Sequence, residues 1–257
     1  MALPGFSLAR RLRAGEAVHT GWCSLGAPVA AEALARDGFT AVTIDMQHGL
    51  WDDAGAQAAI AATRQGGASP VVRVPLEEFG TASRMLDWGA EAIIMPMINT
   101  ADDARRFVAA AKYQPVGERS WAPQRAMMLA GIADQTDYLR EANDNTLTLA
   151  MIETPQAIKN VDAIAAVPGI DMLFIGPYDL SVALSKGAAL DPLSKDVEAA
   201  IDTIVAAAKK AGKLTGLYCA NAERSKAVLS RGISFTAVGN DLGFLRATAA
   251  AQLKALK

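Results

Sequence analysis

The chain has few of the residues that build disulfide frameworks and zinc sites. Its 257 residues include two cysteines, Cys23 and Cys219, and two histidines, His19 and His48. Two cysteines in a chain without a visible export signal are typical of a reducing compartment, so a disulfide between them is disfavoured. Two histidines are too few for a multi-histidine zinc site.

An excess of one charge and long apolar runs are also missing. The 25 basic and 27 acidic side chains leave a net charge of −2, so no basic surface for nucleic acid is expected. No run of about 20 apolar residues could span a bilayer. The arginines Arg10, Arg11 and Arg13 are not followed by the apolar stretch of a signal peptide. We therefore expect a cytoplasmic protein that binds neither nucleic acid nor membranes.

The chain does contain eight short apolar runs rich in Val, Ile and Thr, each followed by a segment with helical spacing. The runs are His19–Ser24, Thr40–Asp45, Pro70–Val74, Ala92–Pro96, Leu147–Glu153, Met172–Gly176, Leu214–Cys219 and Ser234–Gly239. Their continuous apolar character is typical of parallel strands buried on both faces. Eight βα units without a break in composition predict one (β/α)8 TIM barrel domain over residues 1–257. An open doubly wound sheet is disfavoured, because no G-x-G-x-x-G follows the first run.

The intervening segments predict the helices. They are Ala27–Arg36, a helix from Asp52 or Asp53 to Gln65, Phe79–Trp88, Ala101–Lys112, Pro155–Ala166, Ser194–Ala211, Asn221–Arg231 and a last helix from Asn240 or Asp241. The spacing between the fourth and fifth runs is irregular, because residues 113–131 form an insertion after the fourth run. A loop of that length in a compact domain is usually functional or part of an interface.

Ionisable side chains gather at the carboxyl ends of four predicted strands, where barrels of this kind carry their chemistry. Asp45 and His48 follow the second run, Arg73 lies in the third, Glu153 ends the fifth and Asp179 follows the sixth. Their convergence predicts a polar site at one mouth of the barrel.

Each of these residues also has a structural interpretation. Arg73 could pair with a buried acid, and His48 could be a surface loop residue. Glu153 could be a helix N-terminal charge, Asp179 could cap the helix that follows, and Asp87 could be a surface acid at a helix end.

The residue types narrow the chemistry of such a site. Two carboxylates with no cysteine and at most one histidine make a hard oxygen site, which suits Mg²⁺, Mn²⁺ or Co²⁺ with coordination positions left for substrate. None of the lysines lies at the carboxyl end of a predicted strand, and Lys213 precedes the seventh run. A Schiff-base mechanism is therefore disfavoured.

Several blocks of sequence are specific enough to be compared with a known family. They are Ile44-Asp45-Met46-Gln47-His48-Gly49, Val72-Arg73-Val74-Pro75, Leu86-Asp87-Trp88-Gly89-Ala90 with Met95-Pro96-Met97, Ile152-Glu153-Thr154-Pro155-Gln156-Ala157, and Gly169-Ile170-Asp171 with Phe174-Ile175-Gly176-Pro177-Tyr178-Asp179-Leu180-Ser181. In their order and spacing they resemble the class II, metal-dependent pyruvate aldolases of the HpcH/HpaI family. The resemblance covers nearly the whole chain.

The resemblance implies a role for each matching residue. Glu153 and Asp179 resemble the metal-binding pair, and His48 resembles the catalytic base, paired with Asp87. Arg73 resembles the cation beside the keto oxygen of the substrate.

Substrate binding is implied for Arg73 and for Gly176, Pro177, Tyr178 and Asp179. The backbone at Tyr178 and Asp179 would receive the pyruvate carboxylate at a helix start, where free N–H groups point outward.

The activity implied by the resemblance is the reversible cleavage of a 4-hydroxy-2-oxo acid to pyruvate, or hydroxypyruvate, and an aldehyde. It needs a divalent metal ion and no organic cofactor, and the family is typically a hexamer whose neighbouring subunits contribute to the active-site mouth. Two departures bear on it: Gln47 stands where many members have Glu, and Met151 where many have Gln. The loss of the glutamate removes a negative charge beside His48.

Two other functions stay open. A citrate-lyase-like or malyl-CoA-lyase-like enzyme would need contacts for a large CoA group, and no obvious basic pocket for one is seen. A non-catalytic sugar-acid-binding protein on the same scaffold would be expected to lack one of the metal pair or His48.

Asp87 is difficult to bring to His48 within one chain. It precedes the fourth predicted strand, so it belongs at the amino end of the barrel, whereas His48 follows the second strand at the carboxyl end. We therefore expect Asp87 of one chain to reach His48 of a neighbour in a homo-oligomer.

Overall fold

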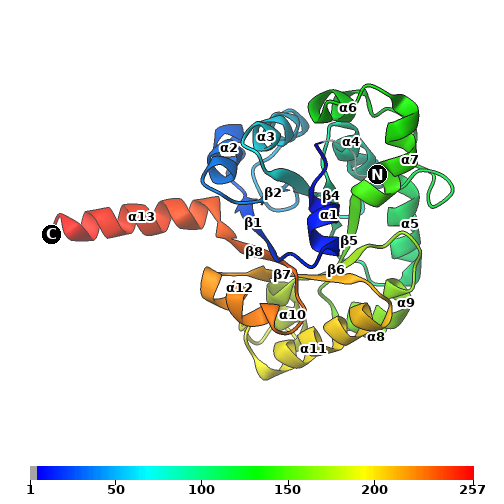
Figure 1. Ribbon diagram of the computed structural model, residues 1–257. Helices are drawn as coiled ribbons and strands as arrows, with labels where there is room; N and C mark the ends of the chain where they lie inside the picture. The colour runs from blue at the N-terminus through cyan, green and yellow to red at the C-terminus, as the bar shows by residue number, and fades with distance from the viewer. Residues whose placement is uncertain (1–4) are drawn as a thin grey trace.

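The computed structural model describes residues 5–257 as one closed barrel of eight parallel strands in sequential order, with β8 paired to β1 (Figure 1). The strands are β1 (Val18–Cys23), β2 (Ala41–Asp45), β3 (Ser69–Arg73), β4 (Ala92–Met95), β5 (Leu147–Ile152), β6 (Met172–Ile175), β7 (Leu214–Cys219) and β8 (Phe235–Asn240). The predicted (β/α)8 fold is confirmed, and every predicted strand boundary is correct to within one residue.

Helices follow the strands on the outside of the barrel. They are α1 (Leu8–Arg13), α2 (Pro28–Arg36), α3 (Asp53–Gln65), α4 (Phe79–Asp87), α5 (Ala101–Ala111), α6 (Gln124–Ala130), α7 (Gln135–Asn145), α8 (Pro155–Lys159), α9 (Val161–Ala165), α10 (Pro177–Leu184), α11 (Lys195–Lys210), α12 (Ala222–Leu229) and α13 (Asp241–Ala255). Side-chain caps fix several starts: Asp52 caps α3, Thr100 caps α5 and Asn240 caps α13.

Two segments between strands differ from a simple βα repeat. The single helix predicted over 155–166 is wrong, because the chain leaves the helical conformation at Asn160, whose side chain donates to the carbonyl of Asn99 at 2.9 Å. Residues 113–131, expected as an insertion, include α6, and α7 follows before β5. Both α6 and α7 bury apolar side chains against Phe6 and Tyr113.

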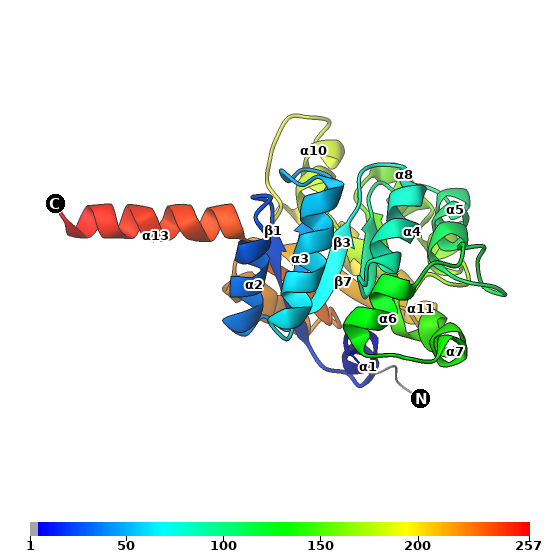
Figure 2. The same ribbon diagram turned by 90° about the horizontal axis from the view of Figure 1, so that it is seen from above.

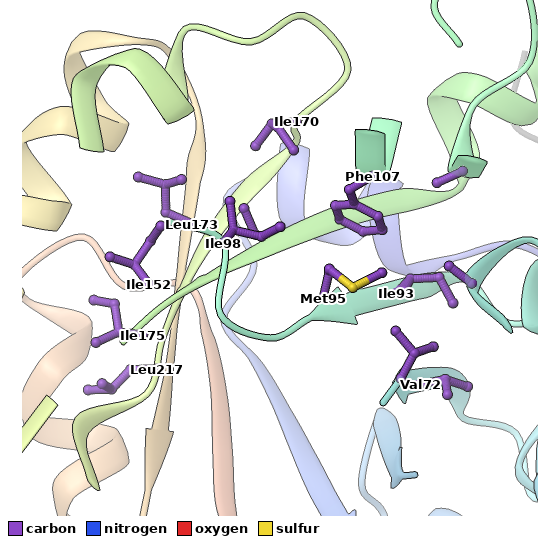
Figure 3. Packing of buried hydrophobic residues seen from close by; sticks show 14 of the residues in the cluster. Val72, Ile93, Met95, Ile98, Phe107, Ile152, Ile170, Leu173, Ile175 and Leu217 are labelled. Atoms are coloured by element: carbon purple, nitrogen blue, oxygen red, sulfur yellow. The ribbon is translucent and has the colours of Figure 1, made fainter. Parts of the chain in front are cut away.

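The core has two layers, because successive side chains of a strand point to opposite faces of the sheet. One set, with Val72, Ile93, Ile152 and Ile175, packs outward against the helices, where Phe107 of α5 meets it (Figure 3). The other set points into the barrel and comprises Val18, Trp22, Ala41, Val71, Ala92, Ile94, Leu147, Leu149, Met151, Met172, Phe174, Phe235 and Ala237. The inward positions continue past these residues to the carboxyl ends of the strands.

The amino end of the barrel is closed by α1. Leu8 and Leu12 pack into the inward cluster, and Glu91, just before β4, accepts hydrogen bonds from the backbone of Ser7 and Leu8 at 2.8 and 2.9 Å. Figure 2 shows α1 and α10 at opposite ends of the molecule. The carboxyl end is therefore the open end.

The last helix, α13, contacts the barrel through its first turn, where Asp241 accepts from the backbone of Ser24 and the ring of Phe244 stacks on Phe39 at 6.4 Å. It projects away from the other elements in both views (Figures 1 and 2), and every residue from Leu242 to Lys257 is exposed. Within residues 5–257, none of the helices combines the length and the apolar character needed to cross a bilayer.

Candidate active site

A pocket of about 430 Å³ lies at the carboxyl ends of the strands. It is lined by Trp22, Ser24, Asp45, His48, Arg73, Met151, Gly176, Pro177, Tyr178, Asp179, Tyr218 and Asn240. The structure thus brings together seven of the site candidates singled out in the sequence, at the ends of β2, β3 and β6: Asp45, His48, Arg73, Gly176, Pro177, Tyr178 and Asp179. Glu153 directly follows β5 and lies behind Gly176.

Arg73 is held in the pocket by Asp45. The two residues are register partners in β2 and β3, and Nε and Nη2 of the guanidinium donate to the two carboxylate oxygens at 2.9 and 2.7 Å. The guanidinium also lies 5.0 Å from the ring of Trp22. Arg73 thus pairs with a buried acid, as its structural interpretation has it, and it also lines the pocket.

Asp45 is the centre of a wider network. Its carboxylate accepts from the indole N–H of Trp22 at 3.0 Å and from the backbone N–H groups of Gln47 and His48 at 3.2 and 3.3 Å. Burial acts to raise the pKa of Asp45, but the hydrogen bonds and charge of Arg73 outweigh it and lower that pKa. Asp45 therefore stays ionised and fixes both Arg73 and the turn that carries His48.

Glu153 is almost fully buried and partly satisfied by the backbone. Its Oε1 accepts from the N–H of Met97 at 2.9 Å, and Met97 adopts a left-handed conformation with φ of 55° to present that N–H. Burial, together with the negative charge of Asp179, raises the pKa of Glu153 to about 7, against the opposing effects of the Met97 hydrogen bond and of Arg73. A cation bound beside Glu153 would therefore stabilise the ionised form of its carboxylate.

Gly176 leaves the space that the Glu153 carboxylate occupies. A Cβ on Gly176 would lie 2.5 Å from Oε2 of Glu153 and 2.7 Å from the methyl carbon of Met151. Any other residue here would displace one of these side chains. The absence of a side chain at this position therefore leaves room for the Glu153 carboxylate directly behind the pocket wall.

Asp179 lies in the first turn of α10 and is exposed at the pocket. It is not the N-cap, because that position belongs to Gly176, which has no side chain to accept a hydrogen bond. Pro177 has no N–H, and the N–H groups of Tyr178 and Asp179 have no partners within the helix. This end of α10 thus offers donors for an anion beside a carboxylate that could hold a cation.

The donor set fits a hard divalent cation with few protein ligands. Among residues 5–257, no group of three or more His, Cys, Asp or Glu side chains could hold a metal ion by itself. The pair Glu153 and Asp179 leaves most coordination positions to water or to a chelating substrate, which is the usual arrangement for Mg²⁺. The residues present therefore fit a metal ion bound together with its substrate.

His48 and Asp87 do not meet within the chain. The imidazole of His48 is exposed on the pocket, whereas Asp87 ends α4 beside β4 and its Oδ1 accepts from Nη2 of Arg119 at 2.6 Å. Burial raises the pKa of Asp87, against the effect of Arg119. Arg119 comes from the 113–131 segment, and its side chain is fully buried.

The wall beside β1, β7 and β8 is not singled out by the sequence. It presents Ser24, Tyr218 and Asn240, and the side-chain N–H of Asn240 donates to the hydroxyl of Tyr218 at 3.4 Å. The amide oxygen of Asn240 caps α13 through the N–H of Gly243 at 2.7 Å, which fixes the direction of the amide. All three residues lie at strand ends, so the rule that identified Arg73 also applies to them.

Comparison with known proteins agrees with this geometry. A family model described as HpcH/HpaI aldolase/citrate lyase matches residues 20–248. A hydroxypyruvate/pyruvate aldolase of Rhizorhabdus wittichii is 37% identical over 91% of this chain and 92% of that protein, and a 5-keto-4-deoxy-D-glucarate aldolase of Salmonella gallinarum is 36% identical over 88% and 87%. The crystal structure of an HpcH/HpaI aldolase/citrate lyase family protein from Burkholderia cenocepacia has a TM-score of 0.87 at 33% identity, over 98% of this chain and 100% of that one.

Proposed function

Because the chain belongs to the HpcH/HpaI aldolase/citrate lyase family, we propose that it is a class II, metal-dependent aldolase. It would reversibly cleave a 4-hydroxy-2-oxo acid to an aldehyde and pyruvate or hydroxypyruvate. The observation that carries the proposal is one pocket lined by the Asp45–Arg73 pair, His48 and Asp179, with the buried carboxylate of Glu153 directly behind Gly176 in its wall.

Glu153 and Asp179 would hold the divalent ion, Mg²⁺, Mn²⁺ or Co²⁺. When bound, it would polarise the keto oxygen of the substrate and stabilise the negative charge that develops there as the carbon–carbon bond breaks. No organic cofactor is needed for this chemistry.

Arg73 would add a fixed positive charge at the same keto oxygen. Its Nε and Nη2 are engaged by Asp45, so Nη1 is the nitrogen left for the substrate. A donor that is already held in place costs no reorganisation during the reaction. The N–H groups of Tyr178 and Asp179 would receive the substrate carboxylate at the start of α10.

His48 would act as the base. It would accept the proton of the substrate's hydroxyl group, directly or through one water, as the carbon–carbon bond breaks, and would return it in the synthetic direction. Its backbone is fixed by Asp45, while its imidazole stays exposed on the pocket.

The relatives support the choice of donor. One is named for hydroxypyruvate and pyruvate, and another for 5-keto-4-deoxy-D-glucarate, which is a sugar acid. We favour the aldolase over a CoA-dependent lyase because these aldolases align over most of both chains. A purely binding function is disfavoured because His48, Glu153 and Asp179 are all present.

We also propose a homo-oligomer, a hexamer by the resemblance. The exposed apolar side chains of α13 support it, because the helix is exposed from Leu242 onward, and a helix with so few tertiary contacts is marginally stable in water. A second copy of the chain would cover this helix, and Asp87 of a neighbour would contact His48. A cytoplasmic location is supported by Cys23 and Cys219, which are buried and unpaired.

An activity screen tests the proposed function. Pyruvate and hydroxypyruvate would each be offered with short and sugar-like aldehydes, in the presence of Mg²⁺, Mn²⁺ or Co²⁺. We expect an aldol product from at least one donor. Absence of any product across the screen, together with tight binding of a sugar acid, would favour the binding protein instead.

A further inference from the structure

We propose that Asp241 is a positioning residue of this pocket, which fixes the loop that carries Ser24 and, through it, the loop that carries His48. Asp241 follows β8 as the first residue of α13 and is 7% exposed. The proposal rests on the proposed function, since it concerns the geometry of the same catalytic site.

The carboxylate of Asp241 ties the end of β8 to the end of β1. Its Oδ1 accepts from the backbone N–H of Ser24 at 2.9 Å and of Leu242 at 2.8 Å, and its Oδ2 accepts from the N–H of Leu25 at 3.1 Å. Because the acceptor is charged, each of these hydrogen bonds is stronger than one to a neutral oxygen. The chain just beyond β1 is thus held by both oxygens of one side chain.

The loop held by Asp241 in turn holds the loop after β2. The carbonyl of Ser24 accepts from the N–H of Leu50 at 2.8 Å, and the carbonyl of Cys23 accepts from the indole N–H of Trp51 at 2.9 Å. His48 lies two residues before Leu50, so a displacement of Ser24 is transmitted to it.

The two loops are also in close steric contact. Gly26 has φ of 69°, and a Cβ there would lie 2.2 Å from the carbonyl oxygen of Leu50. Because the backbones touch at this point, the loops cannot shift independently.

The groups that would bind the donor substrate lie elsewhere. Arg73 belongs to β3, Glu153 follows β5 and Asp179 belongs to α10, and none of them contacts Asp241 through a hydrogen bond in the described chain. Loss of the Asp241 contacts should therefore lower the turnover number kcat while the donor KM stays nearly constant. A general loss of folding would not separate these two constants.

The variant Asp241→Asn removes the contact without changing the size of the side chain. With its oxygen at the Oδ1 position, the new amide group points N–H at the N–H of Leu25. With the amide flipped, it points N–H at Ser24 and Leu242. Either orientation places a donor against a donor, so at least one backbone bond is lost.

Glu91→Gln is the matched control. Glu91 is also buried and also accepts two backbone N–H groups, those of Ser7 and Leu8, but at the amino end of the barrel. Both N–H groups reach Oε2, while Oε1 lies 3.5 Å from Nη1 of Arg64, so Glu91 is a buried carboxylate with backbone contacts at the end of the barrel away from the pocket.

The test combines amide hydrogen exchange with steady-state kinetics on the full chain in Mg²⁺. For Asp241→Asn we expect faster exchange at Ser24, Leu25 and Leu50 and a fall in kcat of about 10-fold or more, with the donor KM within about twofold of wild type. Asp241→Glu keeps the charge, so its exchange rates and its kcat should lie between those of wild type and those of Asp241→Asn. If Asp241→Asn fails to fold, Asp241→Glu is compared with wild type in its place. Glu91→Gln, which also replaces a buried carboxylate by an amide, should leave kcat unchanged.

The proposal is overturned if exchange at Leu50 and kcat both stay at wild-type values in Asp241→Asn, or if Glu91→Gln lowers kcat equally. An inactive wild-type protein would instead refute the proposed function. In that case the exchange at Leu50 still decides whether Asp241 fixes the second loop.

Discussion

Arg73 reaches the pocket in a fixed orientation because Asp45 lies beside it in the adjacent strand. The pairing uses two of the three guanidinium nitrogens and is reinforced by the ring of Trp22. The depressed pKa of Asp45 keeps the pair ionised until well into the acidic range. A side chain that is immobilised before substrate arrives is suited to stabilising developing charge.

The planar guanidinium of Arg73 contacts more than one partner at once, so its replacement by lysine should lower the catalytic rate. Arg73→Lys keeps one charge but cannot contact both oxygens of Asp45 and the substrate together. We expect kcat to fall on the order of 10²-fold, comparable to the loss of one oxyanion donor. Arg84→Lys, at a half-exposed ion pair with Asp53, is the control. Steady-state rates above about half of wild type for Arg73→Lys would contradict this role.

Gly176 can be tested through the metal site that it leaves open. In Gly176→Ala the new Cβ would displace the Glu153 carboxylate, so we expect the affinity for Mn²⁺ in calorimetry to fall about 10-fold or more. Gly80→Ala adds a Cβ in open space on α4 and should leave the affinity unchanged. Equal Mn²⁺ affinities in the two variants would argue that Glu153 is not a ligand.

The rule that strand ends carry the chemistry predicted Arg73, Glu153 and Asp179, because it needs only the approximate end of each run. The partners were harder to predict. Asp45 pairs with Arg73 through the register of β2 and β3, and Arg119 reaches Asp87 from the far side of an insertion. Both depend on three-dimensional packing, which spacing in one sequence does not determine.

At the scale of elements, the strands were the most predictable parts. Continuous Val and Ile runs are typical of parallel strands that helices cover on the sheet faces, so their boundaries follow from composition. The helix α7 is much harder to recognise, because only Tyr138, Ala142 and Asn145 of its polar sequence are buried. The formation of α7 is determined by its packing on the neighbouring segment and not by the hydrophobic pattern of its own sequence.

Lys112 anchors α7 and β5 to the end of α5. Its buried Nζ donates to the carbonyls of Asn143 and Thr146 and to the carboxylate of Asp171, the last at 2.7 Å. In Lys112→Met these acceptors lose their donor, and we expect the free energy of unfolding to fall by about 3 kcal/mol or more.

Lys210→Met is the matched control for Lys112→Met. Lys210 pairs with Asp162 at 3.2 Å on the surface, and such pairs contribute about 0–1 kcal/mol. Urea unfolding of both variants measures the difference. A loss below about 1 kcal/mol for Lys112→Met would show that the buried lysine is dispensable.

At the scale of the whole molecule, α13 should determine the oligomeric state. Leu245, Leu253 and Leu256 are 60%, 63% and 84% exposed on a helix that leaves the barrel. We expect the full chain to be an oligomer in light scattering and a chain ending at residue 242 to dissociate to smaller species. The double substitution Leu245→Ala and Leu253→Ala should weaken assembly in the same direction. A monomeric full-length chain would contradict this role of α13.

The most direct measurement is the aldol cleavage rate after removal of divalent ions, because the central claim is that Glu153 and Asp179 hold a metal ion for carbon–carbon bond cleavage. In excess EDTA we expect the rate to fall to background, and Mg²⁺, Mn²⁺ or Co²⁺ should restore it. Borohydride added with pyruvate should trap no adduct, since no lysine lines the pocket among the described residues. Full activity in excess EDTA, or a lysine adduct with pyruvate, would contradict the account.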